Sequence, residues 1–169
     1  MQNQKELLEE WYRRVSVTQA AHYYSAGNFS ARKYFLGVPT VILTTLVGTS
    51  VFAAIQQQPH YWIQIMVGLA SVAAALLSGL QTFLGDAERG EKHRSAAAQY
   101  GAIGRELECF RAQASEVTEE NLKSLRQALN DLAVESPSIP LKTYRKAGAN
   151  ELKILHNKVV EPAVEASNH

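Results

Sequence analysis

The sequence has no formal charge through its middle. From Tyr34 to Gly85 there is no aspartate, glutamate, lysine or arginine, although 20% of the 169 residues are charged. Whole-chain averages hide this gap, because a net charge of +1 and a mean hydropathy of −0.17 are typical of a soluble protein. The near-zero net charge also gives no support to nucleic-acid binding, which usually shows as a clear basic surplus.

Cysteine and catalytic motifs are scarce as well. The single cysteine, Cys109, excludes an internal disulfide and any zinc site made of several cysteines. On its helical face we expect it to be a small buried hydrophobe. There is no glycine-rich phosphate loop with lysine, no nucleophile elbow and no histidine pair at zinc-binding spacing. We therefore predict no catalytic residue, no metal ligand and no cofactor, and a chain that is not an enzyme.

The charge-free segment contains two apolar runs of membrane-spanning length. Residues 36–55 and 62–84 each reach the roughly 20 residues that a helix needs to cross a bilayer. The polar connector Gln56–Tyr61 contains Pro59 and has to leave the hydrocarbon, which offers no partners to free backbone groups. Two charge-free core helices of a soluble protein are the less economical alternative. The sequence thus predicts an all-α membrane protein with a two-transmembrane helical hairpin.

Basic residues set the orientation of this hairpin. Arg32 and Lys33 precede the first span, and Arg89, Lys92 and Arg94 follow the second, whereas the connector has neither lysine nor arginine. The positive-inside rule therefore places both termini in the cytoplasm. Since the residue before a proline disfavours helix, we expect the first span to begin near Pro39, after an extended or kinked segment.

Small or weakly polar residues recur at three- and four-residue spacing along both predicted spans. We call these positions the small-residue stripe: Thr40, Thr44, Gly48, Gly68, Ser71, Ala75, Ser78 and Thr82. Such residues let helices approach closely and form interhelical hydrogen bonds. Two interpretations stay open: packing within the hairpin, or packing of neighbouring subunits around an aqueous path.

The flanking segments are predicted to be cytoplasmic helices. Residues 1–33 contain an amphipathic helix ending near Gly27-Asn28, and residues 34–85 form the hairpin. Residues 86–169 continue the second span as one helix from about Trp62 to Gln113, with a polar tail after Pro162. Within that helix, Gly101 and Gly104 indicate either local weakening or a close crossing by another helix. The fold predicted is a hairpin continuous with a cytoplasmic helical bundle.

Two further helices follow. Thr118 has the features of an N-cap, with Glu119 and Glu120 in the first turn after it. The segment 136–140, with two prolines, breaks that helix, and a last one is expected over about 143–159.

The N-terminal and long helices are expected to meet along their apolar faces. The candidate interface consists of Trp11 and His22 on the first and His93 and Tyr100 on the second. The two histidines are predicted to be hydrogen-bonded interface residues rather than ligands. If they meet, their coupled protonation would tune the assembly near neutral pH.

The order of short motifs along the chain is similar to that of a known family. These motifs are Trp11, Ala21-His22, Leu36-Gly37-Val38-Pro39, Gly48-Thr49, Gln81-Thr82-Phe83-Leu84, Glu88, His93, Ala96-Ala97-Ala98-Gln99-Tyr100 and Pro137…Pro140…Tyr144. Together they resemble the SLATT family of two-transmembrane proteins, which are associated with nucleotide-second-messenger synthases and nucleotide-sensing domains in bacterial defence. The resemblance covers one domain, about residues 10–155. Its recurring positions here are His22, Gly37, Pro39, Gly48, Thr82, His93 and Tyr100.

The resemblance implies a multi-pass protein of the bacterial inner membrane. It implies a homo-oligomeric effector that forms a pore or permeabilises that membrane during antiviral defence. Unlike multidomain members, this chain has no fused nucleotide sensor, so the partners expected are the bilayer, further copies and a separate nucleotide synthase or sensor protein, with no nucleic acid. The alternative is a non-conducting scaffold that recruits a cytoplasmic partner.

Overall fold

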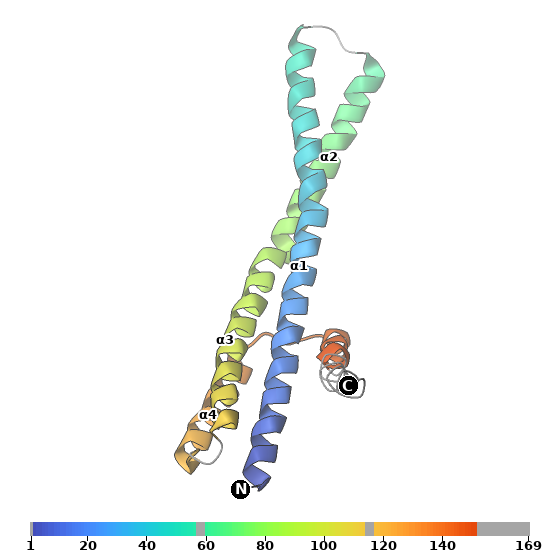
Figure 1. The fold of residues 1–169 in the computed structure, drawn as a ribbon. Helices are drawn as coiled ribbons and strands as arrows, with labels where there is room; N and C mark the ends of the chain where they lie inside the picture. Colours follow the sequence, from blue (N-terminus) through green and yellow to red (C-terminus); the bar gives the residue numbers. More distant parts are fainter. Residues whose placement is uncertain (1, 57–59, 114–116, 152–169) are drawn as a thin grey trace, which may run out of the picture. The chain divides into compact units, whose positions relative to one another are not determined.

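A computed structural model describes residues 2–56, 60–113 and 117–151, and these are helical almost throughout (Figure 1). The helices are α1 (Gln2–Gln56), α2 (Tyr61–Leu84), α3 (Asp86–Ala112) and α4 (Glu119–Glu135), and residues 141–151 are helical too. No strand occurs in these ranges, so the predicted all-α class is confirmed. Residues 57–59 of the predicted connector, the part of the predicted last helix beyond residue 151 and the polar tail lie outside the described residues.

The chain divides into two compact units. Unit 1 takes its described residues from Met1–Gly27 and from the chain after Glu91, whereas unit 2 is Asn28–Gly90. The boundary inside α1 falls at Gly27-Asn28, where the sequence had predicted the N-terminal helix to end. The predicted boundaries at residues 33/34 and 85/86 refer to a membrane surface and stay predictions.

Helix α1 is longer than the sequence predicts. It passes through Gly27-Asn28 without a turn and through Pro39 without an extended segment before it, so both predicted interruptions are wrong. Gly27 keeps a negative φ, since the one positive φ among the described residues is at Gly85. Pro39 removes one backbone N–H, but the surrounding turns of a long helix can tolerate that loss.

A break at Gly85 corrects a second expectation, that one helix runs from Trp62 to Gln113. Gly85 has φ 58° and ψ 30°, a left-handed conformation that favours glycine and ends α2. Its N–H donates to the carbonyl of Gln81 at 3.3 Å, which satisfies one of the last carbonyls of α2. Helix α3 starts at the next residue, with Asp86 and Glu88 in its first turn, where the helix dipole stabilises negative charge.

The start of α4 agrees with the sequence. Thr118 is extended, at φ −85° and ψ 163°, and its side-chain oxygen accepts a hydrogen bond from the Asn121 N–H at 3.3 Å. The helix ends at Glu135, and residues 136–140 are not helical, so the predicted N-cap and the predicted break are both confirmed.

Unit 1 is built around an apolar core shared by α1, α3 and α4. Its buried members are Leu8, Val15, Tyr100, Leu107, Leu125 and Leu132. Helices α1 and α3 approach closely, because a β-carbon on Gly101 would lie 2.7 Å from Gln19 Nε2 and one on Gly104 would lie 3.6 Å from Val15 Cγ1. The prediction that these glycines mark a close crossing is confirmed. Cys109, by contrast, is exposed, so its predicted burial is wrong.

The helical segment 141–151 packs against the first half of α1. Ala147 is buried, and a β-carbon on Gly148 would lie 3.8 Å from Val17. Asn150 Nδ2 donates to the Tyr24 hydroxyl at 2.8 Å, and Lys146 Nζ lies 5.2 Å from the centre of the Tyr24 ring. These contacts make the segment part of unit 1.

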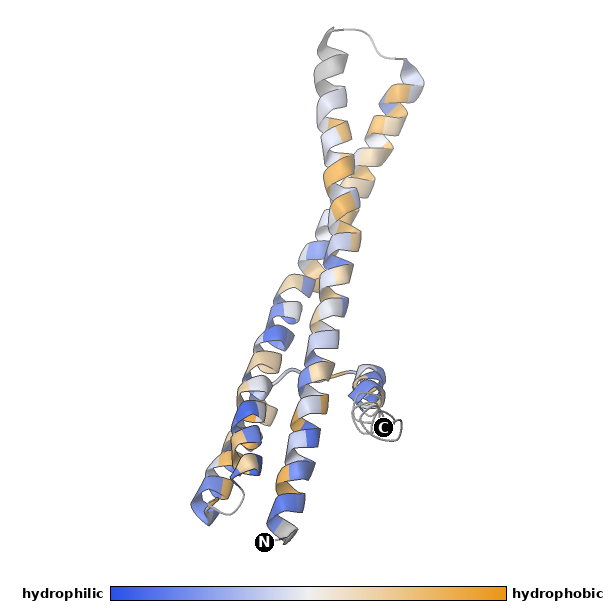
Figure 2. Ribbon diagram, viewed as in Figure 1, coloured by the Kyte–Doolittle hydropathy of each residue, from blue (hydrophilic) through white to orange (hydrophobic). Residues whose placement is uncertain are grey.

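In unit 2, residues 32–50 of α1 lie against α2. Residues early in this stretch contact the end of α2, and Leu43 and Val47 line a cleft of about 510 Å³ with Ile63 and Met66 at its start, so the two segments are antiparallel. The hydropathy colours in Figure 2 place the apolar residues mainly on these two segments. Much of this apolar surface is exposed, with Phe35 at 80% and Trp62 at 70%.

Replacing Leu107 by alanine is expected to destabilise unit 1 by about 2–5 kcal/mol, because it removes a fully buried side chain and leaves a cavity. Thermal unfolding of the detergent-solubilised chain, followed by circular dichroism, measures this change. Leu141→Ala is the matched control, since Leu141 is 63% exposed. Equal unfolding temperatures for the two variants would contradict the assigned core.

Candidate functional site

A buried pair of histidines joins α1 to α3 in unit 1. His22 Nδ1 and His93 Nδ1 lie 2.9 Å apart, and the two residues are 1% and 3% exposed. Their ring centres are 5.1 Å apart. The sequence predicted that the two histidines are hydrogen-bonded interface residues, and this contact agrees with that prediction.

This contact fixes the protons of the two rings. One Nδ1 has to donate its proton and the other has to accept it, so the rings take different tautomers. A pair with no charge satisfies this condition, and so does a pair with one positive charge. Two positive charges leave two donors facing each other and break the bond.

Tyr100 covers the pair from α3. Its ring lies 5.5 Å from the His22 ring at an angle of 20°, a stacked arrangement. Burial lowers the pKa of His22 to about 4, and the charge of His93 contributes in the same direction. Burial also lowers the pKa of His93. Both histidines are therefore neutral at pH 7, and the predicted protonation near neutral pH is wrong, because the apolar surroundings of the pair disfavour charge.

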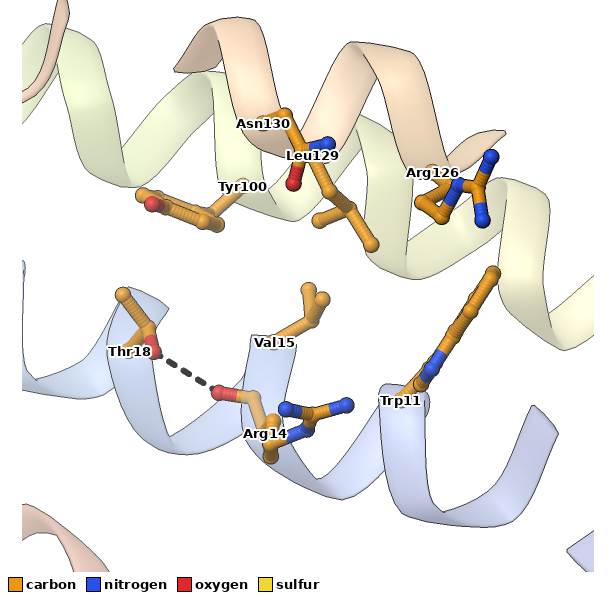
Figure 3. Close-up of a pocket in the computed structure, with 8 residues that line it drawn as sticks. All are labelled: Trp11, Arg14, Val15, Thr18, Tyr100, Arg126, Leu129 and Asn130. Atoms are coloured by element: carbon orange, nitrogen blue, oxygen red, sulfur yellow. Dashed lines mark hydrogen bonds between the residues drawn. The ribbon is translucent and has the colours of Figure 1, made fainter. Parts of the chain in front are cut away.

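Trp11 and Tyr100 lie on the same cavity, of about 310 Å³, between α1, α3 and α4 (Figure 3). Its other lining residues are Arg14, Val15, Thr18, Arg126, Leu129 and Asn130. All four predicted interface residues thus belong to one region of unit 1. His22, His93 and Tyr100 form a cluster of rings, and Tyr100 also lines the cavity together with Trp11. The sequence did not point to Arg126 and Asn130, which lie on the face of α4 next to its apolar stripe.

Unit 2 has its own polar contacts, near Pro39. Gln81 Nε2 donates to the Leu36 carbonyl at 3.0 Å and to Thr40 Oγ1 at 2.7 Å. Thr40 Oγ1 in turn donates to the Leu36 carbonyl at 2.8 Å. These bonds connect α1 with α2 at the turn where Pro39 interrupts the backbone pattern.

Arg32 and Asp86, which lie close in the sequence to the residues of these bonds, form an ion pair. Arg32 Nε is 3.5 Å from Asp86 Oδ2, and the side chain of Asp86 is only 6% exposed. Neither carboxylate oxygen accepts a hydrogen bond from the described residues. This pair was not predicted, although the sequence contains a signal for it: Arg32 is the last arginine before the charge-free segment, and Asp86 is the first acid after it.

The small-residue stripe faces away from the contact between α1 and α2. Thr40 is half-buried and accepts from Gln81, whereas the other seven positions are exposed. A β-carbon on Gly48 or Gly68 would meet no atom within 4 Å. Helix α2 instead contacts α1 through a neighbouring face that contains Ala70, Ala74 and Gln81.

No group of three or more His, Cys, Asp or Glu residues in the described ranges is placed to hold a metal ion. Among the same residues, one stretch is long and apolar enough to cross a membrane. It is Tyr61–Ala112, which comprises α2 and α3 with the break at Gly85 between them, and 6% of its most apolar window is buried.

Comparison with known families identifies the chain. A family model described as "SMODS and SLOG-associating 2TM effector domain family 4" matches residues 4–154. The chain belongs to this family. The predicted SLATT resemblance is thereby confirmed, and the matched region extends slightly beyond its predicted start near residue 10. Neither the curated proteins nor the solved structures contain a match.

The family description adds what the geometry alone does not state. It describes a two-transmembrane effector domain that associates with SMODS and SLOG systems. This is a family of membrane effectors rather than a known family of enzymes.

Acid is expected to destabilise unit 1 through His22. The unfolded chain takes up a proton below a pKa of about 6.5, whereas folded His22 resists it down to a pKa of about 4. Stability therefore falls as the pH drops through this window, by about 2 kcal/mol between pH 7.5 and pH 5. Unfolding temperatures of the detergent-solubilised chain at several pH values measure this loss.

His22→Phe is expected to flatten this pH dependence, because phenylalanine keeps a ring against Tyr100 but cannot titrate. His60→Gln, at an exposed position, is the control and should keep the wild-type dependence. Equal acid sensitivity in all three proteins would assign the effect to other groups.

Replacing Gln81 by leucine is expected to weaken the contact between α1 and α2 by about 1 kcal/mol, the size of an interhelical hydrogen bond between membrane helices. Faster hydrogen exchange at the amides of residues 36–44 would report the change. Thr82→Val is the control, since the Thr82 hydroxyl donates to the Ser78 carbonyl of its own helix. Unchanged exchange in Gln81→Leu would show that its bonds do not hold the two segments together.

Proposed function

We propose that this chain is a membrane effector of a bacterial defence or nucleotide-signalling system, which forms homo-oligomers and opens an aqueous path through the inner membrane. Residues 36–55 and 62–84 cross the bilayer, and both termini lie in the cytoplasm. The small-residue stripe lies between copies or along the path. The observation that carries the proposal is the exposed apolar surface of unit 2, in a chain whose family consists of two-transmembrane effectors.

The exposed apolar surface needs a covering. Val41, Leu46, Met66, Leu69 and Leu76 are each between 56% and 65% exposed. Soluble monomers rarely expose apolar patches of this extent, because contact of such patches with water is unfavourable. Lipid chains or further copies of the same segment would cover them.

The hydroxyl groups of unit 2 suit a bilayer. Thr44 donates to the Thr40 carbonyl at 2.9 Å, Thr45 to the Val41 carbonyl at 2.8 Å, and Ser50 to the Leu46 carbonyl at 2.6 Å. A hydroxyl that is bonded within its own helix costs less in hydrocarbon than a free one. These hydroxyls can therefore face lipid or another copy without a further partner.

The exposed small-residue stripe supports assembly. Two helices are too few to enclose a water-filled path, so conduction requires several copies. On α2 the positions Gly68, Ser71, Ala75, Ser78 and Thr82 are exposed within one chain. Small residues allow the close helix contacts that oligomers in membranes use.

A nucleotide synthase or a nucleotide-sensor protein is the partner we propose from the family description, which names SMODS and SLOG. The alternative function is a non-conducting scaffold. In that case unit 1, with its cavity and exposed polar helix faces, would bind the cytoplasmic partner while unit 2 only anchors it.

Induced expression is expected to collapse the membrane potential of cells, as measured with a potential-sensitive dye at matched membrane levels. The double variant Ser71→Leu, Ser78→Leu should reduce this effect by more than half, because each substitution puts a large side chain in place of a small one in the small-residue stripe. Val72→Leu is the control, since Val72 is 59% exposed on the same helix but outside the stripe.

Unchanged growth and polarisation at confirmed membrane levels would refute the effector proposal for this chain. Stripe variants with full function, together with Trp11 or Tyr100 variants that no longer bind a partner, would favour the scaffold.

A further inference from the structure

The cavity between α1, α3 and α4 has the size of a small-ligand site. Its volume of about 310 Å³ is at the lower end of the roughly 300–1,000 Å³ found for such sites. Figure 3 shows Trp11 and Val15 projecting from α1 toward Leu129 of α4, with the guanidinium groups of Arg14 beside α1 and of Arg126 beside α4. A ligand of about mononucleotide size matches this volume.

The charge of the lining has one sign. Arg14 and Arg126 both line the cavity, and no acidic residue does. Arg14 is only weakly compensated, by an exposed contact of 3.6 Å with Glu10. Arg126 has no ion-pair or hydrogen-bond partner among the described residues. A guanidinium group suits a phosphate, because its planar N–H donors match the phosphate oxygens, and both arginines have exposed side chains that can turn toward a ligand.

The rest of the lining suits a planar ring. Val15, Tyr100 and Leu129 form an apolar floor, as all three belong to or pack against the core. Trp11 is half-buried and offers an aromatic face, on which a heterocycle can stack. Asn130 is exposed and has both donors and an acceptor for the edge of such a ring.

We propose that this cavity binds a phosphorylated compound with a planar heterocyclic ring, of about the size of a mononucleotide. Arg14 and Arg126 hold the phosphate, Trp11 stacks on the ring, and Asn130 contacts the ring edge. The site lies within a single chain and needs no second copy.

A ligand in this cavity would be connected to the histidine pair through Tyr100. The ligand bridges α1 and α4 and touches Tyr100, and Tyr100 stacks on His22, which is bonded to His93. A ligand that stabilises this arrangement would act as a signal to the assembly. That regulatory role rests on the proposed function, whereas the binding site itself does not.

Isothermal titration of the full chain in detergent tests the site, with AMP, GMP, CMP and UMP as probes and adenosine and inorganic phosphate as partial ligands. At least one mononucleotide should bind, and should bind at least about tenfold more tightly than either partial ligand. Arg126→Gln and Trp11→Leu should each weaken that binding at least about tenfold. Arg13→Gln is the matched control: it removes an exposed arginine next to Arg14 that does not line the cavity.

Circular dichroism confirms that each variant is folded before titration. No binding of any mononucleotide at 1 mM would overturn the proposal, as would binding that both cavity variants retain. Phosphate binding as tight as that of the best mononucleotide would overturn the assignment of the ring site.

Conductance of liposomes containing the chain, with and without the mononucleotide, separates this inference from the proposed function. Binding without conductance would leave the site in place and refute the effector. Conductance without binding would refute the site alone.

Discussion

The polar groups of the charge-free segment must satisfy one another, and much of unit 2 follows from this constraint. Without lysine, arginine, aspartate or glutamate between Tyr34 and Gly85, hydroxyls, glutamines and backbone carbonyls make up most of the polar partners. The threonines bond to carbonyls of their own helix, and Gln81 provides bonds across to α1, beside Pro39. At the end of the segment, Gly85 stops α2 and Asp86 pairs with Arg32, so charge returns where the helix ends.

Features that depend on a few neighbouring residues could be predicted from the sequence. The N-cap at Thr118 needs only its own side chain and the following turn, and the break after Glu135 needs only two prolines. The meeting of His22 with His93 was also predictable, because both lie on apolar helix faces that had no other obvious partner. Capping residues, prolines and helical periodicity, all readable along the sequence, were enough for these conclusions.

Features that depend on packing could not be predicted in the same way. Glycine and proline are weak stops inside a long helix, so Gly27 and Pro39 misled the reading of α1. Gly85 ends α2, but α3 begins at the next residue, so the three- and four-residue spacing along the sequence did not reveal the break. The lowered pKa of the histidines reflects their burial where α1 meets α3, and spacing along one helix contains no measure of that. Nothing in the sequence distinguishes Arg126 from the other exposed arginines, and only the packing of the helices places it on a cavity lined by residues of α1.

The histidine pair makes two chemically identical side chains unequal. One ring must present a lone pair and the other a proton, yet either could take either role. Tyr100 stacks on His22, and the two rings have different surroundings, so the two assignments differ in energy. Exchanging the roles requires each ring to move its proton to its other nitrogen, with the bond between α1 and α3 broken meanwhile. The two arrangements have the same charge and differ only in which ring donates the hydrogen bond between α1 and α3.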